Sequence, residues 1–232
     1  MSKKRKLTLL LVAVLVVAVT GFTFAAQYAT ADHTKKVSLN TLGISLVQTA
    51  DASLADAKDE ESTPSDRAKV SYKNIMPGKT INEKLAVKMD ADSQPAYIRV
   101  TATRYWVDRN GKKVEIAKGE EGYLKPESIE IPTENKENWK IFVDKYDPEV
   151  MYFYYLLPVK AGAKTSNFMD SFKIDENADN SYADMSTRID FFAEGVQQSA
   201  GKDAILASWG IDVTLDDSGK IIKVIDDRER KG

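Results

Sequence analysis

Apolar residues that recur at every second position restrict the fold of this chain more than any other feature of its sequence. The clearest runs are Leu85–Met89, Ala96–Val107, Trp139–Val143 and Met185–Glu194. A period of two places successive side chains on opposite faces of a β-strand, so one face of each run can join an apolar core. Turn residues occur between runs, as Met-Pro-Gly at 76–78 and Asp-Arg-Asn-Gly at 108–111. The sequence therefore predicts strands joined by tight turns, with Val114 and Ile116 in the strand that returns after the second turn.

Two other patterns complete the expected fold. Met151–Leu157 is apolar on both faces, which is typical of a strand in the middle of a sheet. A short helix is expected over Ser199–Trp209, and a last hairpin joins Ile211–Leu215 to Ile221–Ile225. Short strands separated by turns, with one short helix, indicate an all-β fold, an antiparallel β-sandwich.

The N-terminal segment reads as a secretory signal peptide. Basic residues at 3–6 precede the apolar run Leu7–Val19, and small residues follow. Cleavage between Ala25 and Ala26 fits the small-residue rule, and cleavage after Ala31 is a second possibility. An uncleaved anchor is the alternative, because the apolar run and its flank reach the length that spans a bilayer. In each case we expect the domain to be exported.

The chain then divides into four parts. Residues 1–25 are the signal peptide, and 26–49 are an N-terminal arm with the first strand. Residues 50–69 form a charged flexible loop, whose carboxylates lack the spacing of a calcium-binding loop. Residues 70–232 form the β-sandwich domain.

Composition excludes several kinds of chemistry. The chain has no cysteine, so it has neither disulfides nor thiolate metal sites. His33 is the only histidine, which excludes a zinc-protease motif with two histidines. Removing the four basic residues at 3–6 changes the formal charge from −2 to −6, and this acidic balance argues against a nucleic-acid partner. We therefore expect no catalytic residue, no metal and no cofactor.

Two sets of residues have both a structural and a functional interpretation. The aromatic run Tyr152–Tyr155 could present a sugar-stacking surface, but alternation favours core packing, with Tyr152 and Tyr154 on one face and Phe153 and Tyr155 on the other. Adjacent carboxylates could form a glycosidase acid/base pair, but their positions favour solvated turns. These pairs are Glu120-Glu121, Asp216-Asp217 and Asp226-Asp227.

Several segments together resemble the TasA/camelysin family of exported Gram-positive proteins. The segments, in chain order, are Thr23–Ala26 with Val37–Leu46, Met76–Thr80 with Pro95–Val100, Tyr154–Gly162 with Thr165 and Phe168, and Ile189–Gln198 with Ala204–Trp209. The resemblance implies a jelly-roll-like sandwich and export through a signal peptidase of the SipW type. It also implies a secreted, non-enzymatic protein of the cell surface or biofilm matrix, as a fibre subunit whose partner is itself or a related subunit.

In this family the N-terminal arm of one subunit adds a strand to the next. Leu39, Leu42, Ile44 and Leu46 are the candidate donor-arm residues here, because alternating apolar side chains fit an exposed sheet edge. The same segment could instead be the first strand of its own sandwich. Gly195, where relatives often have Ala, departs from the family pattern, and so does the charged insertion at 50–69. The metalloprotease activity attached to the camelysin name has no support, because the histidines are missing. The alternative function is an extracellular module that binds sugar or peptide, and a carboxylate hydrolase is a third.

Overall fold

The computed structural model describes residues 42–49, 66–73, 76–116, 118–178, 182 and 184–229. All of them belong to one compact unit, Thr41–Gly232. The signal peptide with Ala25 and Ala26, His33 and Leu39 lie outside these ranges. No helix in the described ranges is long and apolar enough to cross a membrane.

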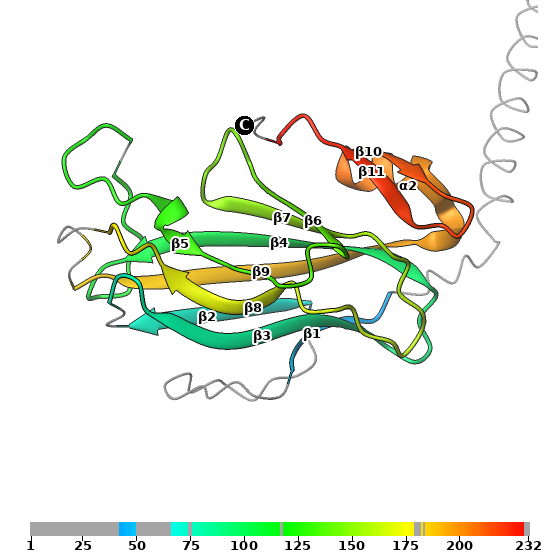
Figure 1. Ribbon diagram of the computed structural model, residues 1–232, viewed down its shortest axis with the longest axis horizontal. Helices are drawn as coiled ribbons and strands as arrows, with labels where there is room; N and C mark the ends of the chain where they lie inside the picture. The colour runs from blue at the N-terminus through cyan, green and yellow to red at the C-terminus, as the bar shows by residue number, and fades with distance from the viewer. Residues whose placement is uncertain are drawn as a thin grey trace, which may run out of the picture. The chain divides into compact units, whose positions relative to one another are not determined.

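Two antiparallel sheets form the sandwich, and a third, two-stranded sheet lies beside it (Figure 1). The four-stranded sheet has the order β1 (Ile44–Gln48), β3 (Thr80–Met89), β8 (Met169–Ile174) and β5 (Ile129–Glu130). The five-stranded sheet has the order β2 (Arg67–Lys73), β9 (Ser186–Gln197), β4 (Ala96–Val107), β7 (Val150–Tyr155) and β6 (Trp139–Val143). The chain passes repeatedly from one sheet to the other, and a 3₁₀ turn at Pro126–Ser128 leads into β5. The prediction of an antiparallel β-sandwich with one short helix is confirmed.

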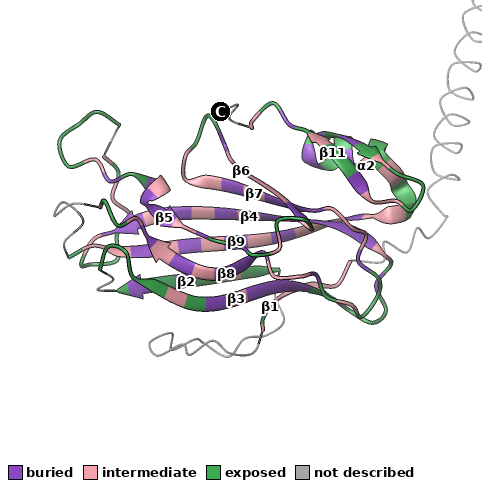
Figure 2. Cartoon of the chain, viewed as in Figure 1, coloured by how far each residue is buried: buried purple, intermediate pink, exposed green. Residues whose placement is uncertain are grey.

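The main core fills the space between the two sheets. Along β9, Thr187, Ile189, Phe191 and Ala193 are buried, while the residues between them are half-exposed. Figure 2 shows the same alternation along the strand. Phe168 lies at the centre of this core, 5.3 Å from the ring of Phe191 and 5.6 Å from that of Phe153. The period of two in the sequence therefore gives the face that each strand presents to the opposite sheet.

A second, smaller core lies on the outer face of the five-stranded sheet. We call the elements that cover it the C-terminal cap: the helix α2 (Gly201–Trp209), with the 3₁₀ turn Gln198–Ala200 before it, and the hairpin β10 (Asp212–Leu215) and β11 (Ile221–Ile225). Figure 1 shows the cap in orange and red beside one end of the sheet. Ile205 and Trp209 are buried there, as the sequence predicts for this helix. Since the sheet has a core on each side, β7 is apolar on both faces.

Two strand predictions need correction. Val114 and Ile116 form no return strand: the turn at 108–111 forms, but only a single bridge, Val107 to Lys113, follows it. The pairing stops there because β7 pairs with β4 from Arg99 to Thr103, and the N–H of Arg104 donates to the carbonyl of Glu149, just before β7. The predicted loop at 50–69 also extends too far, because Arg67, Ala68 and Lys69 pair with β9 as part of β2.

Candidate functional site

β1 occupies the outer edge of the four-stranded sheet and pairs with its own chain. Its partner is β3, in antiparallel register from Ile44 opposite Met89 to Gln48 opposite Leu85. Of the predicted donor-arm residues, Leu42, Ile44 and Leu46 are described, and all three pack partly buried against the main core. In this single chain the segment is therefore the first strand of its own sandwich, which is one of the two alternatives that the sequence allows.

A glycine on the opposite sheet makes room for this strand. An ideal Cβ built on Gly195 of β9 would lie 2.6 Å from Cδ1 of Ile44 and 3.0 Å from Cδ1 of Leu42. Such distances are shorter than the carbon–carbon contact of about 3.5–4.0 Å that van der Waals packing allows. The absence of a side chain at Gly195 thus leaves room for the side chains of Ile44 and Leu42.

Polar contacts hold the backbone of the strand at both ends. At the N-terminal end, the N–H of Gly43 donates to Oγ of Ser93 (2.9 Å), and the N–H of Asp90 donates to the carbonyl of Gly43 (2.9 Å). At the other end, the N–H of Thr49 donates to the carbonyl of Lys84 (2.9 Å). Edge strands depend on such contacts because only one of their sides is paired within a sheet. These contacts fix both ends of β1 on its own sheet.

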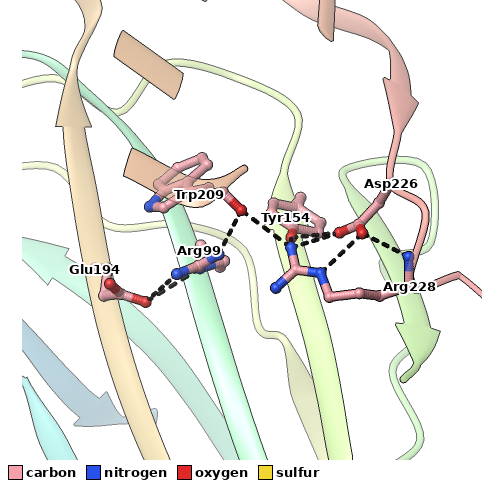
Figure 3. Close-up of polar contacts among 6 residues, drawn as sticks. All are labelled: Arg99, Tyr154, Glu194, Trp209, Asp226 and Arg228. Carbon is pink, nitrogen blue, oxygen red and sulfur yellow. Dashed lines mark hydrogen bonds and ion pairs between the residues drawn. The ribbon is translucent and has the colours of Figure 1, made fainter. Parts of the chain in front are cut away.

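A second polar site joins the C-terminal cap to the five-stranded sheet (Figure 3). Arg99 of β4 donates from Nε and Nη2 to Oε2 of Glu194 on β9, at 3.1 and 2.7 Å. Arg228 donates from Nε to Oδ1 and from Nη2 to Oδ2 of Asp226, at 2.9 and 2.8 Å. Both guanidinium groups also reach the carbonyl of Trp209, the last residue of α2, at 3.5 Å from Arg99 and 3.1 Å from Arg228. Cations are favourable there because a helix C-terminus carries partial negative charge and carbonyls without helical partners.

The aspartate of this site has its pKa controlled by these contacts. Burial by itself would raise the pKa of Asp226, but the hydrogen bonds from Arg228 and Tyr154 outweigh burial and lower it. The hydroxyl of Tyr154 donates to Oδ2 of Asp226 at 3.0 Å, and burial with the nearby carboxylate raises the pKa of this tyrosine. The hydrogen bond to Asp226 is the main cause that raises the pKa of Arg228. The network therefore holds an ionised Asp–Arg pair beside a neutral tyrosine.

Asp226 is the residue for which the solvated-turn prediction is wrong. Its side chain is fully buried, whereas Glu120, Glu121, Asp216 and Asp217 are exposed as the sequence predicts. The sequence places two acidic residues near a charged end of the chain, and nothing in that pattern distinguishes the buried one. An arginine two residues later is the only sequence signal that could have suggested a local ion pair.

The aromatic run packs in both cores rather than forming an exposed platform. Phe153 and Tyr155 face the main core, while Tyr152 and Tyr154 face the smaller one. Tyr154 is fully buried, and the guanidinium of Arg228 lies 4.3 Å from the ring centroid of Tyr152. Trp106 of β4 is also buried. The prediction that alternate aromatics face opposite sides is confirmed.

No group of three or more His, Asp or Glu side chains in the described part of the chain is placed to hold a metal ion. No protein-family model, no curated protein and no solved structure matches this chain. Among the described residues, the candidate functional features are the edge strand β1 with its packing on Gly195 and the polar site beneath the cap. The first can pair with an extended chain, and the second can hold two parts of the domain together.

Proposed function

We propose that this protein is an exported, non-enzymatic structural subunit of the cell surface or biofilm matrix. A SipW-type signal peptidase removes the leader, and the arm that follows then adds a strand to another copy or to a related fibre subunit. The observation that carries the proposal is the position of β1, which lies at the edge of its sheet and packs two arm side chains against Gly195. Strand addition of this kind takes its affinity from main-chain hydrogen bonds and its specificity from pockets for alternate side chains.

The contacts of β1 support an exchange between subunits. All of its sheet pairing is with β3, and Ile44 and Leu46 are only partly buried. An identical strand from a second copy would make the same main-chain hydrogen bonds to β3 and pack against Gly195 in the same way. Exchange of an identical element between copies is a low-cost route to assembly, because the contacts between subunits are the same ones that the element makes within its own subunit.

The ligand-binding alternative loses its main support. That function needs an exposed aromatic surface, and Tyr154 and Trp106 are buried. Tyr152 is half-buried beneath Arg228. We therefore favour assembly over a sugar- or peptide-binding module.

A cysteine cross-link between separate chains tests the proposal, because the natural sequence has no cysteine. Ser45 and Lys88 lie opposite each other across β1 and β3. Directly opposed residues in an antiparallel pair have Cα atoms about 4.5–5.5 Å apart, which suits a disulfide. Chains that carry Ser45→Cys are mixed with chains that carry Lys88→Cys, both beginning at Ala26, and oxidised under conditions of assembly. Since each chain has one cysteine, a disulfide between positions 45 and 88 requires β1 of one chain on β3 of another.

The matched control replaces Lys88→Cys by Thr80→Cys. Thr80 is also exposed on β3 but lies eight residues away, about 26 Å along the strand. We expect a cross-link with position 88 and none with position 80, together with fibres or oligomers in negative-stain microscopy. Assembly without the 45–88 cross-link would refute strand addition, and a protein that stays monomeric in every condition would refute the structural-subunit proposal itself.

A further inference from the structure

The C-terminal cap is joined to the five-stranded sheet mainly by side chains. Its two strands, β10 and β11, form a separate two-stranded sheet and pair only with each other. Its helix contributes Ile205 and Trp209 to the smaller core. One backbone hydrogen bond, from the N–H of Ile221 to the carbonyl of Leu156 (2.8 Å), joins the hairpin to the segment after β7. A unit with few shared main-chain bonds can open while the rest of the domain stays folded.

The segment after β11 returns to the sheet and fastens the cap there. We call residues 226–229 the clasp. The carbonyl of Arg228 accepts from the N–H of Lys145 at 2.8 Å, and Glu229 bridges to Asp144 just beyond the end of β6. Glu229 also forms an ion pair with Lys140 of β6. These contacts fix the clasp to the edge strand of the five-stranded sheet.

Arg228 connects the clasp to both the cap and the sheet. Its Nη2 lies 3.1 Å from the carbonyl of Trp209, in the cap, and 3.2 Å from the hydroxyl of Tyr154, on β7. Its ionic partner is Asp226, whose side chain is fully buried and also accepts from Tyr154. Removing the guanidinium therefore leaves a buried carboxylate without its counter-charge and removes the shorter of the two guanidinium contacts to the carbonyl of Trp209, which is costly in a protein interior.

We propose that the clasp is a conformational device that controls the opening of the C-terminal cap, independently of how subunits assemble. Opening uncovers an aromatic outer face of the five-stranded sheet, which includes Tyr97, Phe142 and Tyr154. It also frees the end of the β6 edge, where Asp144 pairs with Glu229. In the closed state both surfaces are covered by the protein's own C-terminal residues.

Hydrogen exchange read by mass spectrometry tests this proposal on the full protein. In the wild type, we expect the amides of residues 201–225 to exchange with solvent faster than the amides of β4 and β9. Arg228→Gln should speed exchange across 201–225 by about tenfold or more, because the bonds that it removes join a charged guanidinium to the buried carboxylate of Asp226. In the same variant, β4 and β9 should still exchange more slowly than the cap.

The matched control is Arg109→Gln, which removes another arginine from an ion pair with an aspartate, Asp184, but on the exposed surface. It should leave exchange in residues 201–225 at the wild-type rate. Tyr154→Phe, which removes only a hydroxyl, gives a milder test of the same site, with an expected increase of several-fold. Exchange of the cap in step with β4 and β9 would overturn the proposal, as would unchanged cap exchange in both Arg228→Gln and Tyr154→Phe.

Discussion

Gly195→Ala is expected to weaken the docking of β1, although alanine is normally the better residue in a strand. The added methyl group would lie 2.6 Å from Cδ1 of Ile44 and 3.0 Å from Cδ1 of Leu42, so the first must retreat by roughly 1 Å to reach a normal contact. Overpacking of this kind costs about 1–3 kcal/mol. Replacing glycine returns about 0.5–1 kcal/mol, because glycine loses more conformational freedom on folding. A net loss of roughly 1–2 kcal/mol in the free energy of unfolding should remain.

The cause of that loss can be separated from a general effect on the sheet. Ile44→Val removes the clashing Cδ1, so the double variant Gly195→Ala with Ile44→Val should be more stable than the sum of the two single changes predicts. Ile81→Val is the matched control, because Ile81 is also partly buried on the core but lies at the opposite end of β3, opposite Phe172. Its effect should simply add to that of Gly195→Ala.

Urea unfolding followed by circular dichroism measures these free energies. Hydrogen exchange of the Gly43 and Thr49 amides reports on β1 itself, because both amides donate to residues outside the strand. We expect both amides to exchange faster in Gly195→Ala and to recover in the double variant. The reasoning is refuted if Gly195→Ala is as stable as the wild type, or if Ile44→Val adds to it without coupling.

Three further predictions concern the clasp, the start of β1 and the leader. The contacts of Asp226 lower its pKa in the folded state, so they stabilise the fold above the ordinary value of 3.8 and lose this effect as pH falls through the folded-state pKa. Asp226→Asn should therefore lower the free energy of unfolding by about 1.5–3 kcal/mol at pH 7 and by progressively less below pH 4, measured by urea unfolding at each pH. Gly43→Ala should weaken β1, because a Cβ would overlap the side chain of Asp90, and adding Asp90→Ala should relieve part of the loss, since only the Cβ of residue 90 then remains close, at 2.8 Å. Equal exchange protection of β1 in the wild type, in Gly43→Ala and in the double variant would contradict this. Mass spectrometry of the secreted protein should find a mature N-terminus at Ala26, and a chain that retains residues 1–25 would contradict cleavage after Ala25.

The regular elements of this fold could be predicted where the pattern is local. The longest alternating run, Ala96–Val107, is β4 with the same bounds, and the helix and the last hairpin also form where the sequence places them. Each of these depends on a residue period or a turn that a short window of sequence contains. β8 (Met169–Ile174) was not among the expected strands, because it is short and follows a stretch without regular structure.

The errors have a common physical origin in contacts between distant parts of the chain. Val114 and Ile116 follow a suitable turn, but their pairing stops at Trp106, because the next part of β4 bonds to Glu149 and β7, more than thirty residues later in the chain. Asp226 has the local surroundings of a solvated carboxylate, but Tyr154, 72 residues away, donates to it in the interior. The period of apolar residues in one segment carries no information about which distant strand or side chain will pack against that segment.

The sequence by itself determined an all-β fold of strands joined by turns, because alternation gives each strand one apolar face that must be buried against another layer. It also indicated that the segment around Leu42, Ile44 and Leu46 could pair with an exposed sheet edge. Only the tertiary structure decided that this segment lies over Gly195, and that an arginine near the C-terminus fastens the cap to the sheet. Both depend on close approach of atoms far apart in the chain, and close approach is a property of the packed fold rather than of any local pattern.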